Sequence, residues 1–287
     1  MKPRIFSIPE ARYFCSSFSS SKGLSESSLV NINDVLFKSQ NRPIIQETNS
    51  DFISLRDCYL RDIERLLFFS MSQYRRCLDL MIASASPWAL VTSYYGTFYA
   101  AKAILQMFGC VVFYKEIIDV DKGNIGNQAL ERRLFGNSNR NISTTFKGSH
   151  QRFWDVFYDA VIPLRNLISP KLSPALSPIS FSRTWLSDNR NEINYDTCNS
   201  LNEVNIFISN FNSGSFPNCL SGSLSTQFRV MELMIEVAFY FSKFFNISTD
   251  ALNTLQNNNP ALSTKIIDFI YKEKTPRLIR KSKRPYR

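Results

Sequence analysis

The hydrophobic residues between Pro87 and Gly109 form a nearly continuous apolar run, and the other predicted elements can be placed around it. Pro87 suits the first position of a helix, where no backbone N–H is needed, and Gly109 suits the position just after the last turn. Lys102 is the only charged residue between them. A helix that is apolar on nearly all sides lies either at the centre of a core or across a membrane. We predict the core, because small polar residues interrupt the run and no adjoining apolar stretch accompanies it.

Amphipathic patterns before and after this run predict further helices. From Asp51 to Ser84, apolar residues recur every three or four positions, which is the spacing of one helix face. The short link at residues 83–86 predicts that this long helix and the central one are antiparallel neighbours. Similar spacing predicts helices at residues 149–162, 181–195 and 227–245, and weaker ones at 201–208 and 261–271.

Residues 1–50 have a mixed pattern with a serine-rich stretch at 16–28. Two short apolar runs, 29–37 and 43–45, could dock as strands or irregular arms. We therefore interpret residues 1–50 as an extension that lies against a main helical domain at 51–248.

Between the predicted helices, the pattern indicates irregular connections. Residues 110–113 are β-branched and apolar, and they are either a short strand or the exit from the central helix. Residues 121–140 are polar and contain three glycines, which predicts a loop with a short helix at 127–134. Residues 169–182 contain three Ser-Pro pairs and predict an extended linker. The fold class predicted from the whole pattern is all-α.

The charge of the chain is concentrated at one end. The net charge is +10, of which residues 272–287 carry +7, so the rest of the chain holds only +3. We expect residues 249–287 to contain a short helix and a disordered basic tail that binds anions, with Lys281 and Arg284 as candidate RNA-binding residues.

The inventory of reactive side chains excludes several kinds of site. His150 is the only histidine, so a centre with two histidine ligands cannot form within one chain. The six cysteines are scattered without a Cys-x-x-Cys pair, and no P-loop or dinucleotide-binding glycine motif occurs. We therefore predict no metal and no cofactor. The first residues contain no apolar signal core, which favours a cytoplasmic protein with reduced thiols and no membrane contact.

Two polar or aromatic clusters are candidates for chemistry. The segment from Arg190 to Asp196 ends a helical pattern with several polar side chains, although a solvated helix end is the plainer interpretation. The four aromatic residues Tyr94, Tyr95, Phe98 and Tyr99 could stack on nucleic-acid bases. On so apolar a helix we favour a core role for them, with the phenol groups bonded internally.

Three segments, taken in order, resemble the HEPN superfamily. SYYGTFYAAKAIL, at Ser93 to Leu105, looks like the second-helix signature of that family. FKGSHQRFWDVF, at Phe146 to Phe157, resembles its His-Lys start of the next helix. The segment from Arg190 to Asp196 is similar to the family's Arg-x4-6-His element, in the branch that has a tyrosine, here Tyr195, in place of the histidine. The resemblance covers about residues 51–248.

The resemblance implies an up-and-down helical bundle that is commonly a homodimer. In active members the Arg-x4-6-His elements of two protomers face each other and cleave RNA without a metal ion. The residues that match are Arg190, Tyr195 and His150 as candidate catalytic groups, and Asn191 and Asn194 as candidate RNA contacts. Tyr195 stands in the histidine position, and a phenol with a pKa near 10 is a poor base at neutral pH.

The function that we expect from this reading is RNA or nucleotide binding in a prokaryotic defence or toxin–antitoxin system, with metal-independent RNA cleavage as the candidate activity. Its partner would be RNA or a nucleotide, a second copy of the chain, or a protein of the same defence operon. The alternative is a non-catalytic scaffold or regulatory subunit that uses the bundle for oligomerisation. A weaker alternative is a protein that contacts membranes through its basic tail.

Overall fold

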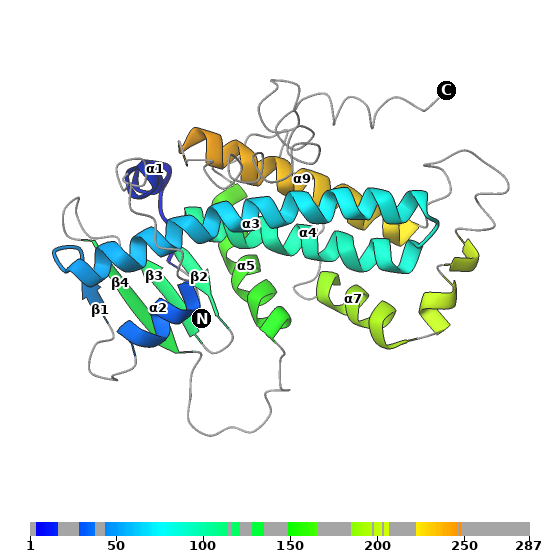
Figure 1. Ribbon diagram of the computed structural model, residues 1–287, viewed down its shortest axis with the longest axis horizontal. Helices are drawn as coiled ribbons and strands as arrows, with labels where there is room; N and C mark the ends of the chain where they lie inside the picture. The colour runs from blue at the N-terminus through cyan, green and yellow to red at the C-terminus, as the bar shows by residue number, and fades with distance from the viewer. Residues whose placement is uncertain are drawn as a thin grey trace.

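The computed structural model is mostly helical and also contains a small four-stranded sheet (Figure 1). The described residues are 4–16, 29–37, 44–113, 116–120, 128–134, 149–165, 185–196, 198–202, 204–206, 222–245 and 247. The predictions for the Ser-Pro segment, for the helix at 261–271 and for the basic tail fall outside these residues.

The centre of the fold is a long helical hairpin. Helix α3, Ser50–Ile82, begins after Asn49, whose side chain accepts a hydrogen bond from the backbone N–H of Asp51. Helix α4, Ser86–Met107, returns alongside it, as the short link predicted. Helix α9, Gly222–Phe244, packs against both and mostly against α4, whose residues are largely buried. The predicted central position of α4 is therefore confirmed. Within the part of the chain that the structure describes, no helix combines the length and apolar character needed to cross a membrane.

Two glycines explain how closely α4 packs and how it ends. A Cβ atom built at Gly96 would lie 2.4 Å from the Sδ atom of Met231 on α9, so this contact requires the absence of a side chain. Gly109 follows the last turn of α4 with φ of +85°, a left-handed conformation that glycine adopts readily. The predicted stop at Gly109 is confirmed.

Shorter helices pack beside the hairpin. Helix α5, Ser149–Arg165, and helix α7, Trp185–Tyr195, agree with the two helices predicted there, and both contact α4. Helix α1, Ile8–Ser16, and helix α2, Leu29–Leu36, precede the hairpin. The apolar run at 29–37 is therefore mostly helical, and not a strand or an irregular arm.

A small sheet accompanies the mostly helical fold that the all-α prediction describes. Its strands are β1, Ile44–Gln46, β2, Cys110–Val112, β3, Glu116–Val120, and β4, Ala129–Leu134. They pair in the order β1-β4-β3-β2, with every pair antiparallel. The helix predicted at 127–134 is wrong, because most of that segment is strand β4. Of the alternatives that the sequence left open for the apolar runs at 43–45 and 110–113, the structure shows a strand in each, β1 and β2.

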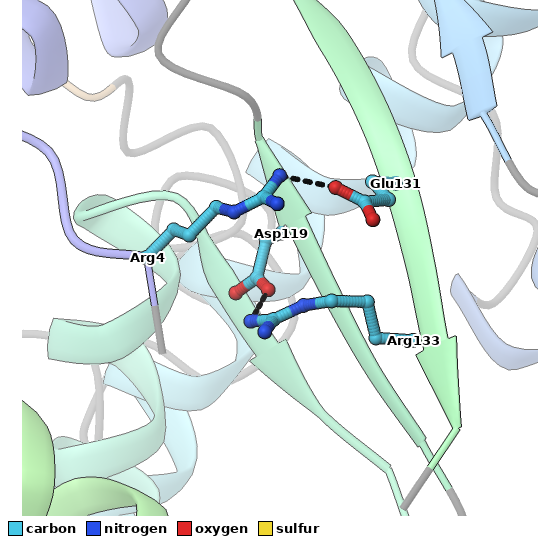
Figure 2. A network of polar contacts seen from close by, with 4 residues as sticks. All are labelled: Arg4, Asp119, Glu131 and Arg133. Carbon is cyan, nitrogen blue, oxygen red and sulfur yellow. Dashed lines mark hydrogen bonds and ion pairs between the residues drawn. The ribbon is translucent and has the colours of Figure 1, made fainter. Parts of the chain in front are cut away.

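Charged residues stabilise strand β4, and because of them its sequence lacks the alternating apolar pattern that predicts a strand. Asp119 and Glu131 lie directly opposite each other on β3 and β4, where two like charges repel. Two arginines compensate this repulsion: Arg133 pairs with Asp119, and Arg4 reaches from the segment before α1 to Glu131 (Figure 2). The strand therefore depends on a residue more than one hundred positions earlier in the chain.

Residues before position 50 contribute directly to the core. The side chains of Phe6 and Phe14 are buried, and the backbone N–H of Phe6 donates to the carbonyl oxygen of Phe108 at 3.0 Å. Helix α2 is attached to the sheet through Asn33, which donates to the carboxylate of Glu116. The described residues before position 50 therefore pack against the end of helix α4 and against the sheet.

Candidate anion-binding site around His150

Three helices bring His150, Tyr94 and Arg190 together. His150 is the second residue of α5, and its Nδ1 atom lies 2.7 Å from the hydroxyl oxygen of Tyr94 on α4. The guanidinium carbon of Arg190, on α7, lies 5.5 Å from the centre of the Tyr94 ring. His150 and Arg190 are thus connected through Tyr94, which both residues contact.

The hydrogen bonds of Tyr94 determine which nitrogen of His150 carries the proton. The indole N–H of Trp154 donates to the Tyr94 hydroxyl oxygen at 3.1 Å. The hydroxyl proton then has one described acceptor, the Nδ1 atom of His150. We infer that neutral His150 is protonated on Nε2. The Nε2 atom has no hydrogen-bond partner among the described residues, so it presents an N–H donor that a ligand can use.

The electrostatic environment keeps His150 neutral at physiological pH. Partial burial lowers the pKa of His150 to about 4, and the nearby positive charges of Arg190 and Lys102 contribute to the same shift. Burial also raises the pKa of Tyr94, so the phenol stays protonated. The polar groups around the imidazole are therefore hydrogen-bond donors and cations, which is the composition of a site for an anion.

Arg190 is held in place by neutral groups. Its guanidinium donates to the side-chain oxygen of Asn191, with Nη2 at 2.5 Å, and to the hydroxyl oxygen of Tyr95 at 3.4 Å. It forms no ion pair with any described carboxylate. A purely structural role, in which Arg190 would pair with an acid and support the bundle, therefore has no partner in this part of the chain.

Lys102 supplies a second cation beside the same aromatic residues. Its ammonium nitrogen lies 5.7 Å from the centre of the Phe98 ring, and that ring is 4.7 Å from the imidazole of His150. Burial lowers the pKa of Lys102, while the charge of Asp62 acts in the opposite direction. Lys102 was noted in the sequence as the one charge of the apolar helix, but it was not predicted as a site residue.

The other predicted site residues are not part of this cluster. Tyr195 is the last residue of α7, its side chain is 79% exposed, and no hydrogen bond or ring contact joins it to another described residue. Asn194 is also exposed. Lys281 and Arg284 lie outside the described residues. The structure therefore unites Arg190, Asn191 and His150 and leaves Tyr195 and Asn194 on the surface.

A metal site is not supported by the geometry around His150. No group of three or more histidine, cysteine or acidic side chains is suitably placed for a metal ion among the residues that the structure describes. Cys15, Cys58, Cys77 and Cys110 are buried free thiols, and Cys198 is an exposed one.

Two residues that complete the site were not selected from the sequence. Tyr94 is one of four neighbouring aromatic residues, and its hydrogen bonds with His150 and Trp154 distinguish it from the others. Lys102 carried a usable signal, because an isolated charge in an apolar helix needs either a partner or a route to solvent.

Comparison with family models, with curated proteins and with solved structures finds no match for this chain.

Proposed function

We propose that this chain is an RNA-binding protein of the HEPN type and that the cluster of His150, Arg190 and Lys102 holds a phosphate group of the RNA. The observation that carries the proposal is the arrangement of three nitrogen donors around one aromatic cluster, none of which forms an ion pair with a described acid, although the charge of Asp62 acts on Lys102. Arg190 would bind a phosphate through two N–H groups, His150 through Nε2–H and Lys102 through its charge. The resemblance in three ordered motifs supports the HEPN assignment, the homodimer and the role in a prokaryotic defence or toxin–antitoxin system.

The hydrogen-bond network favours binding over cleavage. A general base must offer a lone pair to the proton that it removes. The lone pair of neutral His150 is on Nδ1, where it already accepts the hydroxyl proton of Tyr94. Tyr195 lies exposed at the end of α7, outside the cluster. The arrangement is thus a donor site for an anion, in line with a binding or regulatory role.

Metal-independent RNA cleavage is the second candidate function, and it is favoured by the neutral state of His150. If Tyr94 turns its hydroxyl proton away, the imidazole can carry its proton on Nδ1 and present the Nε2 lone pair to a ribose 2′-hydroxyl. Arg190 would then stabilise the charge that develops on the phosphate during attack. This candidate requires the less favourable tautomer.

The test measures RNA binding and cleavage with the same purified proteins. A fluorescein-labelled single-stranded RNA of about 12 nucleotides is titrated with wild type, Arg190→Ala and Arg190→Lys while its anisotropy is recorded. Loss of charge-assisted hydrogen bonds worth about 1.5–3 kcal/mol predicts a loss of affinity of roughly 10- to 150-fold for Arg190→Ala. Arg190→Lys should restore little, because an ammonium group lacks the planar fork of guanidinium.

Arg75→Ala is the matched control, because Arg75 is a surface arginine of α3 that is paired with Asp79. It should bind RNA as wild type does, and Arg190→Ala should melt at nearly the wild-type temperature. A wild type that binds no RNA would contradict the proposal, as would an Arg190→Ala protein that is unstable but binds normally. Cleavage of the labelled RNA in the presence of a chelator, abolished by His150→Asn, would establish the second candidate instead.

A further inference from the structure

The aromatic residues of α4 are divided by the structure into two groups. The side chain of Tyr94 is fully buried, whereas Tyr95 and Tyr99 are only partly buried and Trp88 is 64% exposed. Trp88, Tyr95 and Tyr99 are separated by seven and four positions, which places them on one face of the helix. The buried side of α4 explains the core prediction, but it leaves this outer row without a role.

A fourth ring extends the row onto the neighbouring helix. Phe69 of α3 is 46% exposed, and its ring centre lies 5.6 Å from that of Tyr99. The rings of Tyr99 and Tyr95 are stacked at 6.2 Å, and the hydroxyl of Tyr95 accepts a hydrogen bond from Arg190. A continuous series of aromatic contacts therefore leads from Phe69 to the guanidinium of the proposed phosphate site.

We propose that Phe69, Tyr99, Tyr95 and Trp88 form a platform on which the unpaired bases of single-stranded RNA stack. This inference, which rests on the proposed function, names the class of RNA that the site accepts. We call these four residues the aromatic strip. Bases stack on aromatic side chains without strong sequence preference, and proteins that bind single strands combine such rings with cations that hold the backbone.

Charge at the strip favours a nucleic acid over a protein helix as its occupant. Arg190, Lys102 and the N–H of His150 lie beside the strip, and neither cation forms an ion pair with a described residue, although the charge of Asp62 acts on Lys102. A polyanion that carries planar bases complements both the charges and the rings. Paired RNA is excluded from this mode, because its bases are already stacked and hydrogen-bonded within the duplex.

The experiment uses the full chain and three probes of about 12 nucleotides: oligoadenylate, an abasic ribose-phosphate strand and an RNA duplex. Oligoadenylate should bind at least tenfold more tightly than the abasic strand, because only the former has bases to stack. Phe69→Ala and Trp88→Ala should each weaken oligoadenylate binding about tenfold, equivalent to about 1.4 kcal/mol. Their affinity for the abasic strand should not change, and Phe69→Trp should bind oligoadenylate as wild type does.

Tyr240→Ala is the matched control, because Tyr240 of α9 is 48% exposed and belongs to no part of the strip. It should change neither affinity. Equal binding of oligoadenylate and abasic strands, with Arg190→Ala still weakening both, would overturn the strip and leave the proposed function standing. Failure of the wild type to bind any probe would overturn both. A lower sedimentation coefficient of Phe69→Ala together with unchanged oligoadenylate affinity would show that the strip is a contact between protein chains.

Discussion

The hydroxyl group of Tyr94 is the best place to test how the site is held together. Replacing Tyr94 by phenylalanine keeps the ring in the core and removes only the oxygen that links Trp154 to His150. The side chains of Tyr94 and Trp154 are fully buried, so no water can replace the lost acceptor at the indole N–H without a rearrangement. The substitution therefore separates hydrogen bonding from packing.

The expected cost follows from the two hydrogen bonds. A buried N–H that loses its acceptor costs about 1–3 kcal/mol. The bond to His150 adds less, because the imidazole is only partly buried. We expect Tyr94→Phe to lower the free energy of unfolding by about 2 kcal/mol. Tyr95→Phe should cost less than about 0.5 kcal/mol, because its hydroxyl makes only a 3.4 Å contact with Arg190.

Urea denaturation of a double-mutant cycle measures the effect. In a Trp154→Phe background no indole N–H needs an acceptor, so Tyr94→Phe should lower the free energy of unfolding by less than about 1 kcal/mol. The coupling free energy between the two substitutions should therefore exceed about 1 kcal/mol. The reasoning is refuted if Tyr94→Phe is no more destabilising than Tyr95→Phe. It is also refuted if the two substitutions add within about 0.5 kcal/mol, because the N–H of Trp154 would then not depend on Tyr94.

Two further predictions concern the packing of α4 and the titration of His150. Gly96→Leu should lower the free energy of unfolding by about 1–3 kcal/mol, because its Cβ atom would lie 2.4 Å from the Sδ atom of Met231. Thr92→Leu, on the outer face of α4, is the control and should have little effect. An unchanged urea midpoint for Gly96→Leu would contradict the close contact. The His150 imidazole, the only one in the chain, should titrate by NMR near pH 4, and Arg190→Gln should raise its pKa by removing a positive charge. The unfolded chain takes up this proton at an ordinary pKa of 6.5, so the stabilisation from neutral His150 is complete above that pH and is lost as the pH falls towards 4. The free energy of unfolding should fall by about 1 kcal/mol over this range, after allowance for solvent screening. A midpoint near 6.5, or an equal acid sensitivity of His150→Asn, would show that the ring is not in the described environment.

The elements that could be predicted from the sequence are those in which the pattern of apolar residues matches the buried positions. Helix α4 is apolar on most sides and is buried on most sides, so its pattern states its position. Strand β4 is different, because Glu131 and Arg133 on one of its faces are neutralised by Arg4 and Asp119 from distant segments. Its pattern reads as a polar loop until those partners are known.

The site follows the same rule. Arg190 and His150 were selected because they match the ordered motifs of the resemblance, and both contact Tyr94. The sequence contained no sign that Tyr94 would join them, because its partners lie on a different helix more than fifty positions later. Tyr195 was selected from its place in a motif, and the motif alone does not determine which side of the helix end its side chain lies on. In the structure that side chain is exposed.

The attachment of the first segments to the far end of the sheet has a consequence during synthesis. Residues are made in order, yet Arg4 pairs with a residue 127 positions later, and strand β1 finds its partner only when β4 has been made. Contacts of such high sequence separation form slowly, and the chain must wait for them with apolar surface exposed. Helix α1 and strand β1 are therefore made before the elements that they pack against. Phe14 waits for its ring contact with Tyr59 of α3, and Phe6 waits for its backbone partner Phe108, which comes only after both helices of the hairpin.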